Sequence, residues 1–366
     1  MAISMLDLRK EYQSLKDEID IAISQVLASG VFILGPNVSS FEKEFASYIG
    51  TKFAVAVASG TDALFLSLKA IGVKEGDEVI TTPLTFFATS EAISYTGAKP
   101  VFVDVDPKTH NIDPKKISSV INKKTKAILP VHLWGRPAQM DQIMQIAKEN
   151  NLFVVEDCAQ SSGAEYNGKK TGSFGICGCF SFFPTKNLGC YGDGGIITTD
   201  DEKVYEKLKL LHLHGGKVRG IHEIIGHNSR LDEIQAAILR VKLKYLDRWN
   251  EIRRKNAAIY TKYLSQAGIK CPIELNKEKH VYHQYTIEVE NRQDLIEYLK
   301  TKDISAFVYY PLPLHLQKPY KNLGYKAGDF PESEKIGNQM LSIPIHSFLL
   351  ESDVENIAKT ICEFYK

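Results

Sequence analysis

Short β-rich runs alternate with amphipathic helical segments from about residue 54 to about residue 199. This alternation predicts right-handed crossovers and a mostly parallel sheet with helices on both faces. Ligands of such sheets bind beyond the carboxyl ends of the strands, so a motif that directly follows a strand carries the most functional weight. The seven expected strands are Phe53–Val57, Glu78–Thr81, Pro100–Val103, Ala127–Val131, Phe153–Glu156, Cys179–Phe182 and Gly195–Thr199, and the helical segments between them include Ala63–Ala70, Ser90–Tyr95 and Met140–Glu149.

The pattern changes after Leu231. Residues 232–255 predict one long helix, because apolar side chains recur on one face at Ile234, Ala237, Ile238, Val241 and Leu243. Beyond it, two short strands at 285–289 and 306–309 precede a closing helix at 352–365. We therefore expect a large α/β domain over residues 1–247 and a smaller α+β domain over residues 248–366. In an alternative arrangement, the N-terminal segment packs with the small domain.

The charge balance gives the chain no long-range attraction for polyanions. Its 45 lysines and arginines offset 44 aspartates and glutamates, so neither nucleic acid nor an anionic membrane is expected as a partner. The 6 cysteines include no CxxC pair and have no histidines at metal-ligand spacing, which favours free thiols over a metal site. The first residues lack a signal-peptide core, and no run of about 18 apolar residues occurs. These features predict a soluble, cytoplasmic protein without a metal.

A glycine-containing turn follows the first expected strand and opens a helix, in the run Ala58-Ser59-Gly60-Thr61-Asp62-Ala63. Glycine lets the backbone approach a ligand closely. The amides of a first helical turn, together with the Thr61 hydroxyl, suit a dianionic phosphate. Serine, threonine and aspartate also simply cap helices, and this alternative fits the turn equally well.

Two acids, Glu156 and Asp157, stand at the end of the fifth expected strand. A carboxylate there is costly to bury unless it meets a cation or hydrogen-bond donors. A protonated pyridine nitrogen is such a cation, and this pairing makes pyridoxal an electron sink. The alternative for Asp157 is a structural carboxylate that binds neighbouring amides.

A lysine follows the sixth expected strand, in the run Phe182-Phe183-Pro184-Thr185-Lys186. Desolvation among aromatic side chains would lower the pKa of Lys186 and leave a neutral amine able to form an imine. A solvent-exposed loop lysine is the alternative. The glycines of Gly192-Asp193-Gly194-Gly195 permit close backbone approach, but their spacing is not that of a dinucleotide-binding turn.

A polar run, Asn228-Ser229-Arg230-Leu231-Asp232, precedes the long helix. Ser229 or Asp232 suits the helix cap, whereas Asn228 and Arg230 are placed to bind phosphate or sugar. The preceding loop, from His214 to His227, contains Lys217, Arg219 and His222. It is compatible with a cover over a nucleotide and equally with an exposed basic loop.

The order of these motifs resembles that of fold type I enzymes that use pyridoxal 5′-phosphate (PLP). More narrowly, the chain resembles the DegT/DnrJ/EryC1/StrS family of sugar-nucleotide aminotransferases from about Leu6 to the last helix. The resemblance includes Phe32-Ile33-Leu34-Gly35-Pro36, Ser59-Gly60-Thr61-Asp62-Ala63-Leu64, Thr85-Phe86-Phe87-Ala88-Thr89, Glu156-Asp157, Ser181-Phe182 through Lys186, Gly192-Asp193-Gly194-Gly195, Asn228-Ser229-Arg230-Leu231 and Tyr310-Pro311-Leu312-Pro313-Leu314-His315.

The resemblance implies a role for each matched residue. Lys186 would form the Schiff base and move the proton, and Asp157 would pair with the pyridine nitrogen. Gln160 would bind the ring hydroxyl and Phe86 would lie against the ring. The cofactor phosphate would be held by Gly60, Thr61, Asp62 through its amide, Ser181, and Asn228 from the neighbouring subunit of a homodimer with shared sites. The implied substrate contacts are Phe32, Arg230, Tyr309, Tyr310 and His315, with core packing as the alternative for the two tyrosines.

The resemblance also implies the reaction. The family aminates nucleoside-diphosphate keto-hexoses, commonly with L-glutamate as donor, for the amino sugars of polysaccharides and other glycans. The surroundings of Lys186 and Ser229 are most similar to members that act at C3, on a UDP-2-acetamido-3-keto or dTDP-3-keto-6-deoxy sugar. Amination at C4 of a 4-keto-6-deoxy sugar is the alternative. A dehydratase would have histidine in place of Lys186. A non-catalytic regulator would not need Lys186, Asp157 and the expected phosphate-binding turn at residues 59–62, called the phosphate turn below.

Overall fold

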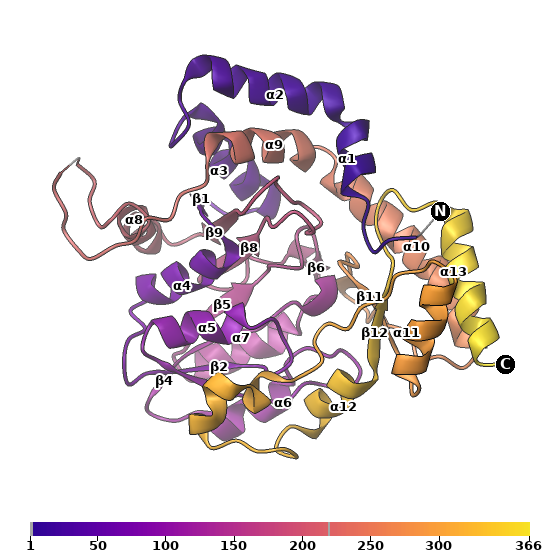
Figure 1. Cartoon of the computed structure of the whole chain (residues 1–366). Coiled ribbons are helices and arrows are strands. Elements are labelled where there is room, and N and C mark those ends of the chain that lie inside the picture. Colours follow the sequence, from indigo (N-terminus) through magenta and orange to yellow (C-terminus); the bar gives the residue numbers. More distant parts are fainter. Residues whose placement is uncertain (1–2, 219) are drawn as a thin grey trace.

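The centre of the molecule is a seven-stranded sheet in the order β1-β9-β8-β5-β4-β2-β3 (Figure 1). The computed structural model describes residues 3–218 and 220–366. The two pairings of β9 are antiparallel and the other four strand pairings are parallel, which confirms the expected mostly parallel sheet. The strands are β1 (Phe53–Val57), β2 (Glu78–Thr81), β3 (Lys99–Phe102), β4 (Thr125–Ile128), β5 (Phe153–Asp157), β8 (Cys177–Ser181) and β9 (Gly195–Thr199).

Helices cover both faces of this sheet because side chains along each strand point alternately to one face and the other. Val55 and Val57 of β1 lie in one hydrophobic cluster, whereas Ala54 and Ala56 lie in another. The first face is covered by α4 (Gly60–Ala70), α5 (Ala88–Tyr95) and α8 (Glu202–Leu211). The opposite face packs against α3 (Pro36–Ile49), α6 (Pro114–Ile117), α7 (Met140–Glu149) and α9 (Glu233–Leu243).

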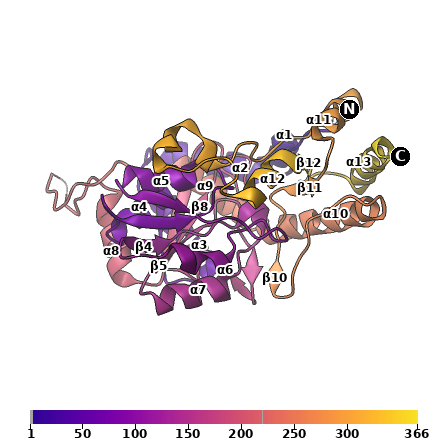
Figure 2. The same cartoon turned by 90° about the horizontal axis from the view of Figure 1, so that it is seen from below.

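A second hydrophobic core lies to one side of the sheet (Figures 1 and 2). Its elements are α10 (Leu246–Gln266), α11 (Arg292–Thr301), α13 (Glu351–Phe364) and the antiparallel pair β11 (Tyr285–Glu288) and β12 (Met340–Ile343). Near the start of the chain, Ile3 pairs with Ile304 and packs against this core.

Two elements differ from the sequence expectation. The single long helix expected over residues 232–255 is two helices, α9 and α10, because α9 buries its apolar face on the large sheet while Tyr260 and Leu264 of α10 belong to the second core. The strand expected at 306–309 is only one bridge, between Phe307 and Ser342. Pro311 and Pro313 follow it, and proline cannot donate to a strand ladder.

The chain returns to the large sheet after this bridge. Two 3-10 helices, η3 (Leu314–Leu316) and η4 (Lys318–Leu323), precede α12 (Pro331–Gln339). Leu314 and Tyr320 pack with Phe102 of β3. The Asp104 carboxylate caps α12, because its two oxygens accept from the amides of Glu332 at 3.1 Å and Ser333 at 2.9 Å. This return holds residues 309–310 above the carboxyl ends of the strands.

The N-terminal helices lie beside α9 (Figure 1). They are α1 (Leu8–Ser14) and α2 (Lys16–Ser29). The ammonium of Lys242, fully buried on α9, lies 2.5 Å from the Glu11 carboxylate of α1 and donates at 2.6 Å to the carbonyl of Gly189. The first helix therefore contacts, through one side chain, the loop that contains Lys186.

The remaining elements are short. A small sheet has the order β10-β6-β7, from β6 (Glu165–Tyr166), β7 (Lys169–Lys170) and β10 (Glu278–Lys279), and two further 3-10 helices are η1 (Ser118–Val120) and η2 (Leu133–Gly135). Within residues 3–218 and 220–366, no helix is long and apolar enough to cross a membrane.

Candidate active site

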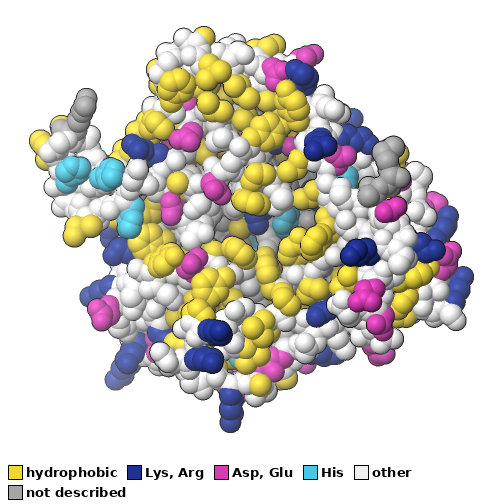
Figure 3. Space-filling view, in the orientation of Figure 1, with side chains coloured by type: hydrophobic (Ala, Val, Ile, Leu, Met, Phe, Trp, Pro, Cys, Tyr) yellow, Lys and Arg dark blue, Asp and Glu magenta, His cyan; other side chains and the backbone are white. Residues whose placement is uncertain are grey.

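A cavity of about 510 Å³ opens at the carboxyl ends of β5 and β8. On this side the molecule is hollowed near its centre and apolar side chains surround the hollow (Figure 3). The cavity is lined by residues of the large sheet and its turns, by Tyr309, Tyr310, His283 and Gln284 from the later part of the chain, and by Met5 and Leu6. Its place at the ends of the strands is where ligands of such sheets bind.

The glycine-containing turn forms one wall of the cavity. Ser59 caps α4 by accepting from the amide of Asp62 at 3.1 Å, so Gly60 and Thr61 form the first helical turn. A methyl group on Gly60 would lie 2.6 Å from Cβ of Ser181 at the end of β8. A Cβ on Gly195 would lie 2.3 Å from the carbonyl oxygen of Ser59. Both glycines are therefore required by close backbone approach, and the turn presents free amides beside the Ser181 hydroxyl.

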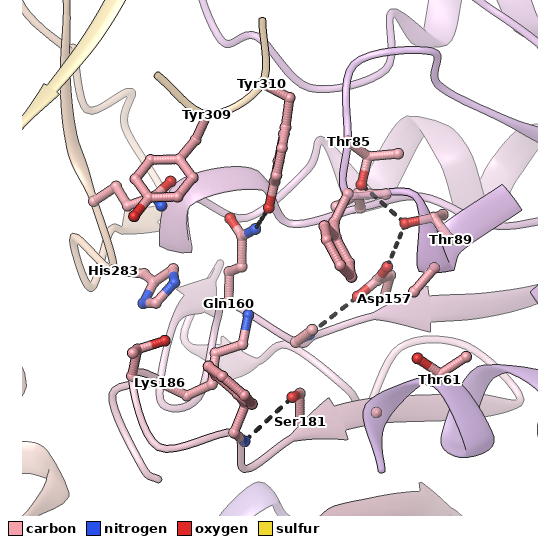
Figure 4. Close-up of a pocket in the computed structure, with 18 of the residues that line it drawn as sticks. Thr61, Thr85, Thr89, Asp157, Gln160, Ser181, Lys186, His283, Tyr309 and Tyr310 are labelled. Carbon is pink, nitrogen blue, oxygen red and sulfur yellow. Dashed lines mark hydrogen bonds between the residues drawn. The ribbon is translucent and has the colours of Figure 1, made fainter. Parts of the chain in front are cut away.

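Asp157 is buried at the end of β5 and faces the cavity (Figure 4). One carboxylate oxygen accepts from the Thr89 hydroxyl at 2.8 Å and the other from the amide of Ala159 at 3.1 Å. Thr85 contacts Thr89 in turn, at 2.9 Å. Burial raises the pKa of Asp157, and its hydrogen bonds and the nearby Lys186 only partly oppose this effect. The carboxylate thus lies in a place where an additional cation would stabilise it.

The neighbouring Glu156 faces away from the cavity. Its oxygens accept from the amides of Gly172, Phe174 and Gly175 at 2.8–2.9 Å, and they contact Nε2 of His132 at 3.0 Å. Nδ1 of His132 accepts from the amide of Ala138. Glu156 and His132 also lie near Cys158 in a buried group of metal-ligand types. The lone pairs of the histidine and the carboxylate are directed at N–H donors, which makes this group a structural network.

Lys186 extends from the loop between β8 and β9 into the cavity (Figure 4). Its amide donates to the carbonyl of Phe183 at 2.9 Å, and Cys190 closes the loop by donating to Phe182 at 2.8 Å. Burial lowers the pKa of Lys186 to about 8, against the opposing attraction of Asp157. The amine is therefore neutral far more often near pH 7 than that of an ordinary lysine.

Gln160 is held between two parts of the cavity wall. Its Oε1 accepts from the amide of Trp134 at 2.6 Å, and its Nε2 donates to the Tyr310 hydroxyl at 3.0 Å. One hydrogen of Nε2 remains for a ligand. The ring of Phe86 lies 5.8 Å from that of Tyr310 and is 56% exposed, so an apolar aromatic face is open to the cavity.

The structure brings nine of the residues singled out in the sequence to the cavity wall: Gly60, Thr61, Phe86, Asp157, Gln160, Ser181, Lys186, Tyr309 and Tyr310. Asp62 lies behind the turn, where its carboxylate accepts from the Ser229 hydroxyl at 2.6 Å. Phe32, His315, Asn228 and Arg230 do not line the cavity of the described chain. His315 is buried beside Glu334, at 3.1 Å, whereas Phe32 is 47% exposed.

Asn228 lies at the base of the loop that projects from the body beside α8 (Figure 1). It is exposed, and its neighbour Ser229 is buried behind the phosphate turn. In the projecting loop, Lys217 pairs with Glu206 and His222 contacts the carbonyl of His214. Arg219 lies outside the described residues.

Sequence reasoning missed His283, Gln284 and Thr89. The first two precede β11 in the second half of the chain, whereas from the sequence we look for functional residues only directly after strands of the large sheet. Thr89 belongs to a segment that was matched as a whole, but its contact with Asp157 spans 68 positions. The sequence signal that could have indicated His283 and Gln284 is that these two polar residues stand directly before the expected strand at 285–289.

The cavity fits pyridoxal 5′-phosphate on three separate grounds. Free amides at the start of α4 suit its phosphate, and the open face of Phe86 suits its ring. The under-compensated carboxylate of Asp157 suits a protonated ring nitrogen. Lys186 opens on the same space, which is large enough for a small organic ligand.

Comparisons with known proteins show similarity to a family of aminotransferases. The model of the DegT/DnrJ/EryC1/StrS aminotransferase family matches residues 13–362. The chain is 48% identical over 369 residues to the pleiotropic regulatory protein of Geobacillus stearothermophilus, covering 100% of this chain and 99% of that relative. It is 42% identical over 360 residues to UDP-N-acetyl-3-dehydro-alpha-D-glucosamine 3-aminotransferase of Acidithiobacillus ferrooxidans, covering 98% and 97%. The solved structure of S. venezuelae DesV in complex with a ketimine intermediate is 40% identical with a TM-score of 0.98, covering 100% and 99%.

Proposed function

The chain belongs to the DegT/DnrJ/EryC1/StrS aminotransferase family, and we propose that it transfers an amino group from L-glutamate to C3 of a nucleoside-diphosphate keto-hexose. Its cofactor is PLP, as in the family. The observation that carries the proposal is the convergence of Lys186, Asp157 and the phosphate turn on one cavity. The product would be an amino-sugar nucleotide for a polysaccharide or another glycan.

When bound, PLP supplies the electron sink through which an amino group passes between an amino acid and a keto sugar. The chain holds and orients it. The amides of Gly60 and Thr61, with the Thr61 and Ser181 hydroxyls, would bind the phosphate, and Phe86 would cover one face of the ring. The amide of Asp62, which the sequence also predicted at the phosphate, donates to the Ser59 hydroxyl instead. Asp157 would hold a proton on the ring nitrogen.

Lys186 moves the proton that the reaction requires. Because burial lowers its pKa to about 8, a useful fraction of its Nζ is neutral near neutral pH and accepts a proton from the substrate carbon. The resulting ammonium would then deliver that proton on the cofactor side, and in the half-reaction with the keto sugar the same group would carry a proton in the opposite direction. Gln160, fixed by Trp134 and Tyr310, would donate its remaining hydrogen to the ring hydroxyl.

Amination at C3 is supported by the similarity to the 3-aminotransferase of Acidithiobacillus ferrooxidans, which by its name acts on a 3-dehydro sugar nucleotide. The candidate substrates are a UDP-2-acetamido-3-keto hexose and a dTDP-3-keto-6-deoxy hexose. The Tyr309 and Tyr310 side chains line the cavity and are placed to contact the sugar.

A homodimer with shared sites is part of the proposal. An apolar patch over α2 and the turn after it, visible at the upper edge of Figure 3, is compatible with a second copy. Its exposed side chains are Ile21, Leu27, Val31, Phe32, Ile33 and Leu34. In such a dimer, Asn228 of each chain would complete the phosphate site of the other, and Arg230 would reach its substrate.

Product analysis tests the proposal. The holoenzyme is given ¹⁵N-labelled L-glutamate with either a 3-keto or a 4-keto sugar nucleotide, and NMR locates the label. We expect amination at C3, and Lys186→Ala as the control should form no labelled amine. Exclusive labelling at C4 would contradict the regiochemistry, and no labelled amine with either sugar would contradict the function.

One relative is named as a regulator, so a cofactor-free binding protein is the second candidate. A visible absorbance band in the purified protein that borohydride abolishes would exclude it. The intact Lys186, Asp157 and phosphate turn lead us to expect that band.

A further inference from the structure

His283 lines the cavity between Tyr309 and Lys186 (Figure 4). It is 9% exposed, and its Nδ1 contacts Oδ1 of Asn187, the residue after Lys186, at 3.1 Å. Within the described part of the chain, the other ring nitrogen, Nε2, makes no hydrogen bond to another residue, and it is not among the fully buried unpaired atoms. A histidine with one nitrogen bound and the other open to a cavity can bind a ligand there through the open nitrogen.

The tautomer of this ring follows from a chain of hydrogen bonds that ends at backbone carbonyls. Asn250 donates through Nδ2 to the carbonyl of Ser162 at 3.0 Å, so its Oδ1 is an acceptor. Asn187 therefore donates through Nδ2 to that oxygen at 2.8 Å and to the carbonyl of Val281 at 3.1 Å. Both of its hydrogens are used, and its Oδ1 can only accept.

His283 must then carry its hydrogen on Nδ1, which leaves Nε2 with a lone pair. Burial, together with the nearby charge of Lys186, lowers the pKa of His283 well below the ordinary value. The ring is accordingly neutral at physiological pH. Nε2 is a fixed hydrogen-bond acceptor, not a donor and not a cation.

The next residue is a second unsatisfied group on the same wall. Gln284 is 7% exposed and lines the cavity, and its amide oxygen is buried without a hydrogen-bond partner in the described chain. Its backbone amide is anchored to the carbonyl of Trp134 at 3.2 Å. Two consecutive residues thus present polar side chains to the cavity, and the Gln284 oxygen lacks the partner that buried groups normally have.

The chemistry of Nε2 distinguishes between the two substrates. A neutral acceptor repels a carboxylate, and glutamate has two carboxylates. The only donor group of glutamate is the nitrogen that is transferred. A keto-hexose, in contrast, carries hydroxyl groups that donate hydrogen bonds. Resting on the function proposed above, we propose that Nε2 of His283 accepts a hydrogen bond from a hydroxyl group of the sugar and so acts in the sugar half-reaction alone.

The test separates the two half-reactions of the holoenzyme. In the first, L-glutamate is mixed with the enzyme and the absorbance change of the bound cofactor is followed in a stopped-flow instrument. In the second, the aminated enzyme is mixed with the 3-keto sugar nucleotide. The variants are His283→Phe, which keeps a planar ring without the acceptor, and His283→Gln, which restores an acceptor oxygen. His346→Gln, a buried histidine that does not line the cavity, is the matched control.

We expect His283→Phe to weaken the apparent sugar affinity by roughly ten- to a hundredfold, the effect of leaving a buried hydroxyl unpaired. The glutamate half-reaction should stay within about twofold of wild type. His283→Gln should recover most of the sugar affinity, and His346→Gln should change neither half-reaction. An equal loss in both half-reactions, a loss with glutamate alone, or no loss at all would overturn the proposal.

A second readout does not depend on turnover. In holoenzyme labelled with ¹⁵N-histidine, the resonance lost in His283→Gln should show Nε2 unprotonated. Adding a nucleoside-diphosphate hexose that carries neither an amino nor a keto group, and so cannot react, should shift that resonance, whereas adding glutarate, a dicarboxylate without an amine, should not. A protonated Nε2 in the free holoenzyme, a shift with glutarate alone, or no shift with the sugar nucleotide would refute the assignment even if His283→Phe fails to fold. If wild-type enzyme does not react with glutamate at all, the proposed function fails independently of His283.

Discussion

Replacing Gly60 by alanine should separate cofactor binding from folding. The added methyl group would lie 2.6 Å from Cβ of Ser181 and 3.1 Å from its Cα and Oγ. Carbon atoms pack at about 3.5–4.0 Å, so the start of α4 and the end of β8 must move apart by roughly 1 Å. Neither side can move freely, because Ser181 is paired with Gly195 and Gly195 already contacts the carbonyl of Ser59.

The displaced groups are the ones that face the cofactor phosphate. Overpacking of this kind costs about 1–3 kcal/mol. The expected weakening of PLP binding is therefore roughly 5- to 150-fold, at about 1.4 kcal/mol per tenfold change in affinity. The assay is a titration of cofactor-free protein with PLP, followed by quenching of tryptophan fluorescence. A thermal unfolding curve of the same cofactor-free variant reports whether the effect is confined to the site.

A double mutant identifies the cause. Ser181→Gly alone removes the hydroxyl donor and should weaken PLP binding, whereas Gly60→Ala combined with Ser181→Gly loses the 2.6 Å clash and keeps only the 3.1 Å contact with Cα of residue 181. The double variant should bind PLP about as well as Ser181→Gly alone, so the two effects should not add. Wild-type affinity in Gly60→Ala, or strictly additive losses in the double variant, would refute the reasoning from this contact.

The remaining predictions concern charge, assembly and stability. The rate at which cofactor-free protein reacts with PLP should rise with pH and level off above about 8, because Lys186 loses its proton there. Asp157→Asn removes the charge that favours the protonated amine, so the pH midpoint of this rate profile should move to lower pH. An unchanged midpoint would count against the attraction between Asp157 and Lys186. The same Asp157→Asn variant should retain its fold by circular dichroism and lose most of its transamination rate, whereas an unchanged rate would leave Asp157 a structural residue. Mixing the inactive variants Lys186→Ala and Asn228→Asp under conditions of subunit exchange should restore roughly a quarter of wild-type activity, since about half the dimers are mixed and each has one intact site of two. No recovery after verified exchange would place Asn228 in its own chain's site or leave it structural. Glu156→Gln should lower the free energy of unfolding by about 2–4 kcal/mol in urea titrations because several buried N–H donors lose a charged acceptor, and a change below about 0.5 kcal/mol would show that the network is dispensable.

Much of the large domain was predictable because its signals are local. Each strand is a short apolar run, and the phosphate turn, Asp157 and Lys186 each follow such a run directly, which places them at the same edge of a parallel sheet. The break between α9 and α10 was not predictable from periodicity, since both helices continue an amphipathic pattern while packing on different cores. The environments of His315 and His283 were equally hidden. One histidine pairs with Glu334 and the other with Asn187, 96 positions away, and only the tertiary fold brings such partners together.

The position of β1 has a consequence for synthesis of the chain. This strand lies at the edge of the sheet, and its one partner in the ladder is β9. As the chain leaves the ribosome, the apolar run Phe53–Val57 therefore has no strand to pair with until residues 195–199 have been made, a wait of roughly 7–28 s at ordinary translation rates of about 5–20 residues per second. An unpaired apolar strand is a template for association with other chains during that wait. The phosphate turn begins directly after β1, so the cofactor site is completed late in synthesis. The yield of active enzyme should therefore depend more on chaperone supply and growth temperature than on the stability of the finished fold.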